Sequence, residues 1–294
     1  MLTNSCEIVE ALRSDLPLRV RDNLDSQDSN EREHASWVFI QFAKVPLGKT
    51  YITEKKIIKE LADLFNDPVE RIRRNAYETL IYLSEQREGC ESVVKEGIIP
   101  ILVDKLVTEK SERVIVQTIT LIKQLLYAEK GPEIALGTPI ISRVKGLLDF
   151  LSSELKRLSA EVLGSLSFSY PGKLRVIEQE CIKPLGDLLS DDMPEVRGAA
   201  LLALASLSIE KSAKVEIALE EGFLLKIMEL LKDSDQENRL NAVQLISNVA
   251  EYPPAKVEFQ NCLEQLREMV GNDDEEEIVK RFADKAIDII TWKP

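Results

Sequence analysis

The chain has 294 residues, of which 44% are hydrophobic, 30% charged and only 5% aromatic. This composition excludes disordered, collagen-like and low-complexity chains, and it supplies enough apolar side chain for a large core. With 51 acidic against 38 basic residues the net charge is −13, which repels phosphate and argues against nucleic acid and anionic membranes as partners.

Cysteine and histidine are too sparse for most metal or nucleophile chemistry. The four cysteines stand far apart without a C-x-x-C pair, and His34 is the single histidine. Zinc sites with several imidazoles and a dense disulfide framework are thereby excluded. The first residues lack the basic and apolar regions of a signal peptide, and the apolar stretch 199–207 is too short to span a bilayer. We therefore expect a soluble intracellular protein.

Two independent marks recur along the chain with a period of about 42 residues, which is typical of a helical repeat array. One mark is a short apolar segment with a central acid, and the other is Arg-x-x-Ala or a variant with a small substitute. The acids are Asp63, Asp104, Asp149, Asp187 and Glu229. The arginines are Arg32, Arg73, Arg113, Arg157, Arg197 and Arg239, and Lys280 continues the series.

In chain order, the predicted repeats occupy residues 1–46, 47–88, 89–130, 131–172, 173–213, 214–255 and 256–294 of a single solenoid. Each is expected to be a helix, a polar turn and a second helix, as in 223–250, where apolar residues fall at helical spacing on both sides of a polar turn at 233–235. Gly97 and Gly222 suit a tight bend before the first helix. The repeated arginines are expected to pair with acids of adjacent turns.

The period and helix pattern resemble armadillo and HEAT repeats. The resemblance lies in EGIIPILVDKL from residue 96, in 180–207 and in 221–250, while Asp-x-x-Pro-Glu-Val-Arg at 191–197 is shared with HEAT repeats. The sequence therefore predicts an all-α, armadillo/HEAT-like right-handed superhelical solenoid of about seven repeats.

Each candidate catalytic or ligand site has a stronger structural interpretation. His34 has no serine or cysteine placed beside it by a local motif, so we interpret it as a packing or capping residue. Gly48-Lys49-Thr50 ends like a phosphate-binding loop, but Ala43 stands where that motif requires glycine. The acidic runs 233–237 and 272–277 lack the glycine and terminal glutamate of a calcium loop. We expect no enzymatic activity, no metal and no cofactor or small-molecule substrate.

Because no catalytic or ligand site is predicted, we turn to the long concave surface of the solenoid, a feature by which repeat proteins bind extended partners. Counting from the alanine of Arg-x-x-Ala places two inner-facing positions in each repeat, and these are mostly apolar in the third to fifth repeats. An amphipathic helix would suit such a groove. The alternative is that the helical phase is wrong by one position and these residues are core. The protein-binding candidates are Thr118, Ile122, Val162, Leu166, Leu202, Ser206, Gln244 and Asn248.

Three classes of function remain: a scaffold in a large assembly, a nuclear import adaptor and an enzyme. An import adaptor needs a regular ladder of Trp and Asn on the inner helices, and the twelve inner positions of the first six repeats hold one of each, Trp37 and Asn248. The import function is therefore disfavoured. A general armadillo-type protein-binding adaptor in the cytosol stays an alternative to an assembly scaffold.

A closer resemblance favours the assembly scaffold. The closing segment VKRFADKAIDIITWKP, the segment 171–222 and IPILVDKL at 99–106 are similar to the radial spoke head protein 14 family of armadillo-repeat axonemal proteins. The resemblance runs from about residue 100 to 294. It implies a non-catalytic subunit of the radial spoke in motile cilia and flagella, located in the cytoplasm and the axoneme. Its implied partners are other spoke proteins, especially a helical stalk scaffold.

Overall fold

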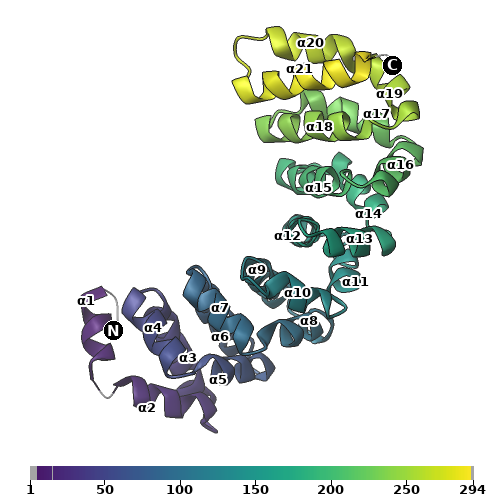
Figure 1. The fold of residues 1–294 in the computed structure, drawn as a ribbon. Helices are drawn as coiled ribbons and strands as arrows, with labels where there is room; N and C mark the ends of the chain where they lie inside the picture. Colours follow the sequence, from purple (N-terminus) through teal and green to yellow (C-terminus); the bar gives the residue numbers. More distant parts are fainter. Residues whose placement is uncertain (1–4, 15, 293–294) are drawn as a thin grey trace. The chain divides into compact units, whose positions relative to one another are not determined.

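The computed structural model describes residues 5–14 and 16–292, which form α-helices and short 3-10 helices and no β-strand. The chain divides into two units, Met1–Ile140 and Ile141–Pro294. Figure 1 shows each unit as a stack of helices in sequence order. The predicted all-α, armadillo/HEAT-like solenoid is confirmed, whereas its description as one seven-repeat domain stays a prediction.

The first unit repeats a pattern of a short helix, a second helix and a long third helix. Its elements are α1 (Ser5–Leu12), α2 (Leu16–Asp22), η1 (Asn23–Asp25), α3 (Ser29–Ala43), α4 (Pro46–Glu54), α5 (Ile58–Asp63), η2 (Leu64–Asn66), α6 (Glu70–Leu83), α7 (Arg87–Lys95), α8 (Ile98–Thr108), α9 (Glu112–Leu125) and α10 (Gly131–Leu136). The third helices α3, α6 and α9 pack against one another in that order.

The second unit continues the same pattern. Its elements are α11 (Ile140–Lys145), which begins at the boundary, α12 (Ser153–Leu166), α13 (Tyr170–Glu178), α14 (Ile182–Asp187), η3 (Leu188–Ser190), α15 (Pro194–Leu207), α16 (Lys211–Leu219), α17 (Phe223–Glu229), η4 (Leu230–Lys232), α18 (Gln236–Val249), α19 (Pro253–Glu258), η5 (Phe259–Cys262), α20 (Leu263–Gly271) and α21 (Glu277–Thr291). Its third helices α12, α15, α18 and α21 stack side by side (Figure 1).

The expectation of two helices per repeat is wrong, because a short helix of six to nine residues precedes each pair, as α4, α7, α13 and α16 do. These helices are short enough to be taken for part of a turn. Pro253 begins α19, where proline needs no N–H donor. The bends at Gly97 and Gly222 are confirmed, with φ of 77° and 78° directly before α8 and α17.

Each third helix carries a small or short residue in seventh place, where the neighbouring helices approach closely. These residues are Ala35, Ala76, Thr118, Ser159, Ala200, Ala242 and Ala283, and all are buried. The core of each unit consists of aliphatic side chains from all three helices of a repeat, with few aromatic rings. Burial of this aliphatic surface is the main source of stability, at roughly 25 cal/mol per Å².

Candidate protein-binding surface

The third helices present one exposed stripe each, at the ninth and thirteenth residues counted from the helix start. In the second unit Leu202 is 43% exposed, and Ser206, Gln244 and Asn248 are half-buried. Ser206 Oγ donates a hydrogen bond to the carbonyl of Ser167 at 3.1 Å. These four predicted residues therefore lie on an accessible helix face.

The other four predicted residues are core. Thr118, Ile122, Val162 and Leu166 have no exposed surface, so the expected apolar row in the third and fourth repeats is wrong. The cause is the sequence register, because Arg113 and Arg157 were taken as the repeat arginines. In α15 and α18 the repeat arginine is the fourth residue of the helix, whereas the fourth residues of α9 and α12 are Ile115 and Lys156. The exposed stripe therefore lies two positions from the predicted one in α9 and one position from it in α12.

The structural register gives a different row, more polar than expected. Its members in α9 and α12 are Thr120, Gln124, Glu161 and Ser165, and each is half-buried. These are the residues that the sequence reasoning missed. Lys156 was the available signal, because it stands 41 residues before Arg197, the same spacing as from Arg32 to Arg73.

A hollow of about 320 Å³ lies across α12, α15 and α18 on this face. Its floor is formed by Gly198, Ala199 and Leu202 of α15. A side chain at Gly198 would clash with α18, because an added Cβ would lie 2.5 Å from Oδ1 of Asn238. The small floor residues therefore hold α15 and α18 close together and leave a recess above them.

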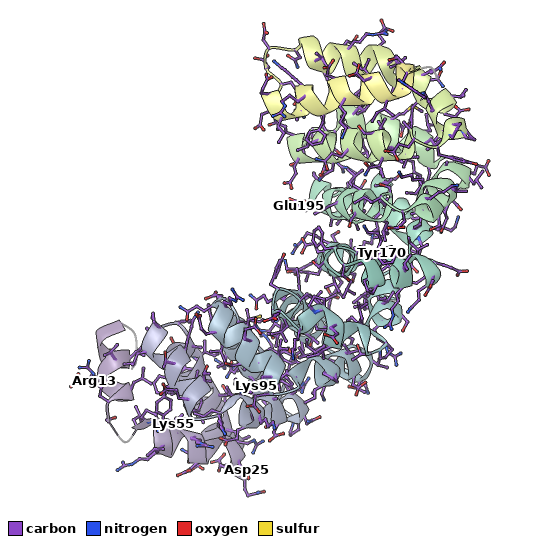
Figure 2. All side chains as sticks on the ribbon, in the orientation of Figure 1. Arg13, Asp25, Lys55, Lys95, Tyr170 and Glu195 are labelled. Atoms are coloured by element: carbon purple, nitrogen blue, oxygen red, sulfur yellow. The ribbon has the colours of Figure 1, made fainter. Side chains whose placement is uncertain are left out.

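Acidic side chains line that hollow. Glu195 and Glu237 are exposed and make no ion pair with any residue of 5–14 and 16–292, whereas Glu161 is bridged to Arg157 within α12. Asp235 accepts a hydrogen bond from the backbone N–H of Asn238 at 3.0 Å and so caps α18. Figure 2 labels Glu195 at the start of α15. The hollow is therefore an electronegative site.

The opposite ends of α12 and α15 each carry an exposed apolar side chain. The sixteenth positions of α12 and α15, just beyond their last residues, are Phe168 and Ile209, which are 69% and 61% exposed. The equivalent positions after α6 and α18 hold Glu85 and Glu251. Packing of the repeat therefore does not require an apolar residue there.

A ladder of ion pairs keeps the third helices in register. Nε of Arg197 lies 2.7 Å from Oδ2 of Asp233 in the next repeat, and Nη1 donates to the carbonyls of Asp191 and Asp192 at 2.8 and 3.1 Å. Each arginine of this ladder thus joins the turn before its own helix to the turn of the following repeat, whereas Lys156 bonds to Asp191 in the following turn. The other pairs are Arg32–Asp67, Arg73–Glu109, Lys156–Asp191 and Arg239–Glu275.

The expected pairing of repeat arginines with acids of adjacent turns is thereby confirmed at four arginines. It is wrong at Arg113, which is exposed and makes no ion pair among the described residues, and at Arg157, which bridges to Glu161 in its own helix. Burial disfavours ionisation of Asp233, but hydrogen bonds from Arg197 and from the backbone N–H of Asp235 outweigh it and lower the pKa of Asp233. The same balance lowers the pKa of Asp191 and Glu109.

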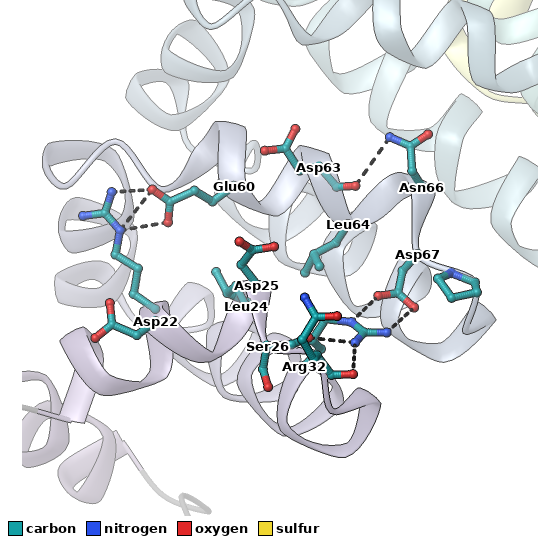
Figure 3. Close-up of a pocket in the computed structure, with 13 residues that line it drawn as sticks. Asp22, Leu24, Asp25, Ser26, Arg32, Glu60, Asp63, Leu64, Asn66 and Asp67 are labelled. Carbon is teal, nitrogen blue, oxygen red and sulfur yellow. Dashed lines mark hydrogen bonds and ion pairs between the residues drawn. The ribbon is translucent and has the colours of Figure 1, made fainter.

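A second hollow, of about 710 Å³, lies in the first unit between α2, η1 and α5, η2. Figure 3 shows two ion pairs across it, Arg21–Glu60 and Arg32–Asp67. Its remaining acids, Asp22, Asp25 and Asp63, are exposed. Four of its seven charged side chains are therefore held in ion pairs that join successive repeats.

Among the motifs weighed for catalysis and ligands, the segment Gly48-Lys49 serves packing. Lys49 is buried in α4, where Nζ lies 2.9 Å from Glu85 Oε2, and a side chain at Gly48 would overlap the carbonyl of Phe42. His34 is exposed on α3 and is not the packing residue that we expected. In the described part of the chain no group of three or more His, Cys, Asp or Glu side chains is placed to hold a metal ion, and no helix could cross a membrane.

The fold and this surface define the class: an armadillo-like repeat scaffold suited to protein binding. The chain belongs to the dynein axonemal assembly factor 5-like family of TPR repeats, whose model matches residues 41–215. TPR units are two-helix repeats of about 34 residues, so the three-helix repeats here are longer. Residues 173–270 also match the family of non-SMC mitotic condensation complex subunit 1.

Several solved structures that share the fold are designed or engineered proteins. A computationally designed armadillo repeat protein for modular peptide recognition is 22% identical, with 79% of this chain and 99% of that chain covered and a TM-score of 0.72. A designed armadillo repeat protein in complex with the peptide (KR)4 is 21% identical, with 80% and 99% covered and a TM-score of 0.71. An engineered protein is 17% identical, with 98% and 81% covered and a TM-score of 0.75. At these identities the likeness shows the fold alone.

Proposed function

We propose that the protein is a non-catalytic scaffold subunit of the radial spoke in the axoneme of motile cilia or flagella. In this role it binds other spoke proteins, including a helical stalk scaffold, through its solenoid surface. The observation that carries the proposal is the resemblance of residues 100–294 to the radial spoke head protein 14 family. The match of residues 41–215 to a family described by an axonemal function supports the same cellular setting.

The exposed end of α21 is consistent with a contact role. Trp292 is 64% exposed, and Lys256 Nζ lies 5.2 Å from the centre of its ring. A large exposed aromatic side chain near the end of a solenoid is more useful to an interface than to a core. The two residues that follow it in the closing Trp-Lys-Pro lie outside the described residues.

The test is affinity purification of the tagged protein from detergent-extracted axonemes of ciliated cells, followed by mass spectrometry. We expect spoke subunits to be recovered in constant ratio and the protein to remain with the axoneme after extraction. Enrichment of importins or cadherin-complex proteins instead would contradict the proposal. The variant Trp292→Ser tests the exposed end, and Tyr127→Ser, which is 74% exposed in the first unit, is its matched control.

A second candidate is a cytosolic protein-binding adaptor that acts during assembly of axonemal machinery. It is favoured by the family description, which names a dynein axonemal assembly factor. The two candidates differ in location, because an assembly adaptor leaves its client before the axoneme is complete. Recovery of the protein only in the detergent-soluble cytoplasmic fraction, bound to unassembled subunits, would favour the adaptor.

A further inference from the structure

The third-helix face of the second unit has two chemically different ends, and this polarity identifies the kind of segment that it can hold. At the start of α15 and α18, Glu195 and Glu237 stand at the hollow of about 320 Å³ without an ion pair among the described residues. At the far end of α12 and α15, Phe168 and Ile209 are exposed. Leu202 lies between the two ends along α15 and is 43% exposed.

The acidic end fits an arginine or lysine side chain. The aliphatic stem of such a residue can lie along Ala199 and Leu202 while its charged head reaches the two free carboxylates. An acidic side chain would meet repulsion there, because the only cation at the hollow, Arg157, is already bridged to Glu161. The hollow therefore selects for positive charge.

The apolar end fits aromatic or aliphatic side chains. Exposed apolar side chains that the repeat does not need for packing mark a contact surface. From Glu195 to Leu207, the last residue of α15, is twelve residues of helix, or about 18 Å at 1.5 Å per residue, and Ile209 lies two residues further. An extended peptide of roughly six residues covers that distance.

We propose that this face binds a short extended segment of a partner protein that carries Arg or Lys at one end and Phe, Leu or a similar residue about six positions away. The basic end lies at Glu195 and Glu237, and the apolar end lies on Phe168 and Ile209. This inference rests on the proposed function as a scaffold, since it names the chemistry of the partner at that surface.

The test is selection of random twelve-residue peptides displayed on phage against the full chain. We expect enriched peptides to share a basic residue separated by about six positions from an aromatic or leucine residue. In fluorescence anisotropy with a selected peptide, Glu195→Gln plus Glu237→Gln should weaken binding about tenfold, or by about 1.4 kcal/mol, because two exposed charge pairs are lost. That loss should shrink at high salt. Phe168→Ser plus Ile209→Ser should weaken binding in a salt-independent way.

Matched controls change the same residue types elsewhere on the second unit. Glu178→Gln plus Glu221→Gln removes two exposed acids that make no ion pair within the described chain, and Leu219→Ser plus Leu225→Ser removes two exposed leucines. Both control variants should bind the selected peptide as the parent does. Circular dichroism and thermal melting of every variant should match the parent, because all eight side chains are exposed.

Three results would overturn the inference: no enrichment, enrichment of acidic peptides, or binding that survives both substitutions on the face. The outcome is separable from that of the proposed function. A variant that combines Glu195→Gln, Glu237→Gln, Phe168→Ser and Ile209→Ser separates the two proposals. If it still enters spokes, the face inference fails while the spoke function stands. If the peptide binds as described but the protein is absent from axonemes, the spoke function fails while the face inference stands.

Discussion

Replacement of Arg197 by Met tests whether the ion-pair ladder holds the repeats together. The side chain of Asp233 is 1% exposed and that of Arg197 is 15% exposed, so the pair is almost wholly removed from water. Methionine keeps much of the apolar stem but loses all three hydrogen bonds, which leaves the Asp233 carboxylate without its cation and two backbone carbonyls without their donor. Loss of one partner of a buried pair costs about 3–5 kcal/mol. Because Arg197 retains some contact with solvent, we expect about 3 kcal/mol.

The assay is urea unfolding followed by far-ultraviolet circular dichroism. Arg267→Met is the control, because Arg267 is exposed on α20 and makes no ion pair among the described residues. The control should change stability by less than about 0.5 kcal/mol. The double variant Arg197→Met, Asp233→Leu should be more stable than the single Arg197 variant, because no charge is then left buried. Equal stability of Arg197→Met and Arg267→Met would refute the ladder as a source of stability.

Four further expectations follow from burial and ionisation. Ala200→Asp should lower the melting temperature strongly, because it buries an unpaired charge between third helices. We expect it to lower the free energy of unfolding by about 3 kcal/mol or more. Gly186→Ala should also destabilise, because the added Cβ would lie 1.4 Å from the Phe223 ring, whereas Gly271→Ala meets nothing within 4 Å and should be tolerated. Acidification should destabilise the protein. The ladder carboxyls whose pKa is lowered in the fold, those of Glu109, Asp191 and Asp233, stabilise it fully above their ordinary pKa values of 4.5 for Glu and 3.8 for Asp. They lose that stabilisation as the pH falls through the lower pKa values of the folded state, which thermal melts at a series of pH values would show. Burial raises the pKa of the Cys181 thiol to about 11, so a thiol reagent at neutral pH should label it only after unfolding.

The fold could be predicted from the sequence because the spacing of apolar side chains indicates helices and the recurrence of the arginine and acid marks gives the repeat length. Leu240, Val243, Leu245 and Ile246 recur at helical spacing and lie in α18. The short helix of each repeat could not be recognised, because α16 has only nine residues and mixes polar with apolar positions. Such a short segment is stabilised by tertiary packing rather than by its own propensity.

The surface was predictable only where the repeat mark was unambiguous. In α15 and α18 the arginine and the alanine stand three residues apart, and the inner residues derived from them are accessible. In α9 the fourth residue is Ile115, so the ladder has no cation there, and the nearest arginine, Arg113, gave the wrong phase. A shift of two residues turns a helix by about 200° at 3.6 residues per turn. The residues predicted to be exposed on α9, Thr118 and Ile122, are therefore buried in the core.

The acids of one turn show why charge alone could not separate structure from binding. Asp233, Asp235 and Glu237 alternate along the sequence and have the same formal charge. In the fold, Asp233 is buried against Arg197, Asp235 caps α18, and Glu237 is left exposed at the hollow. The first two carboxylates have their charge satisfied within the protein, so they attract a partner little. The third keeps its charge toward solvent. Recognition on this surface therefore depends on the acids that the ladder and the helix caps leave unpaired.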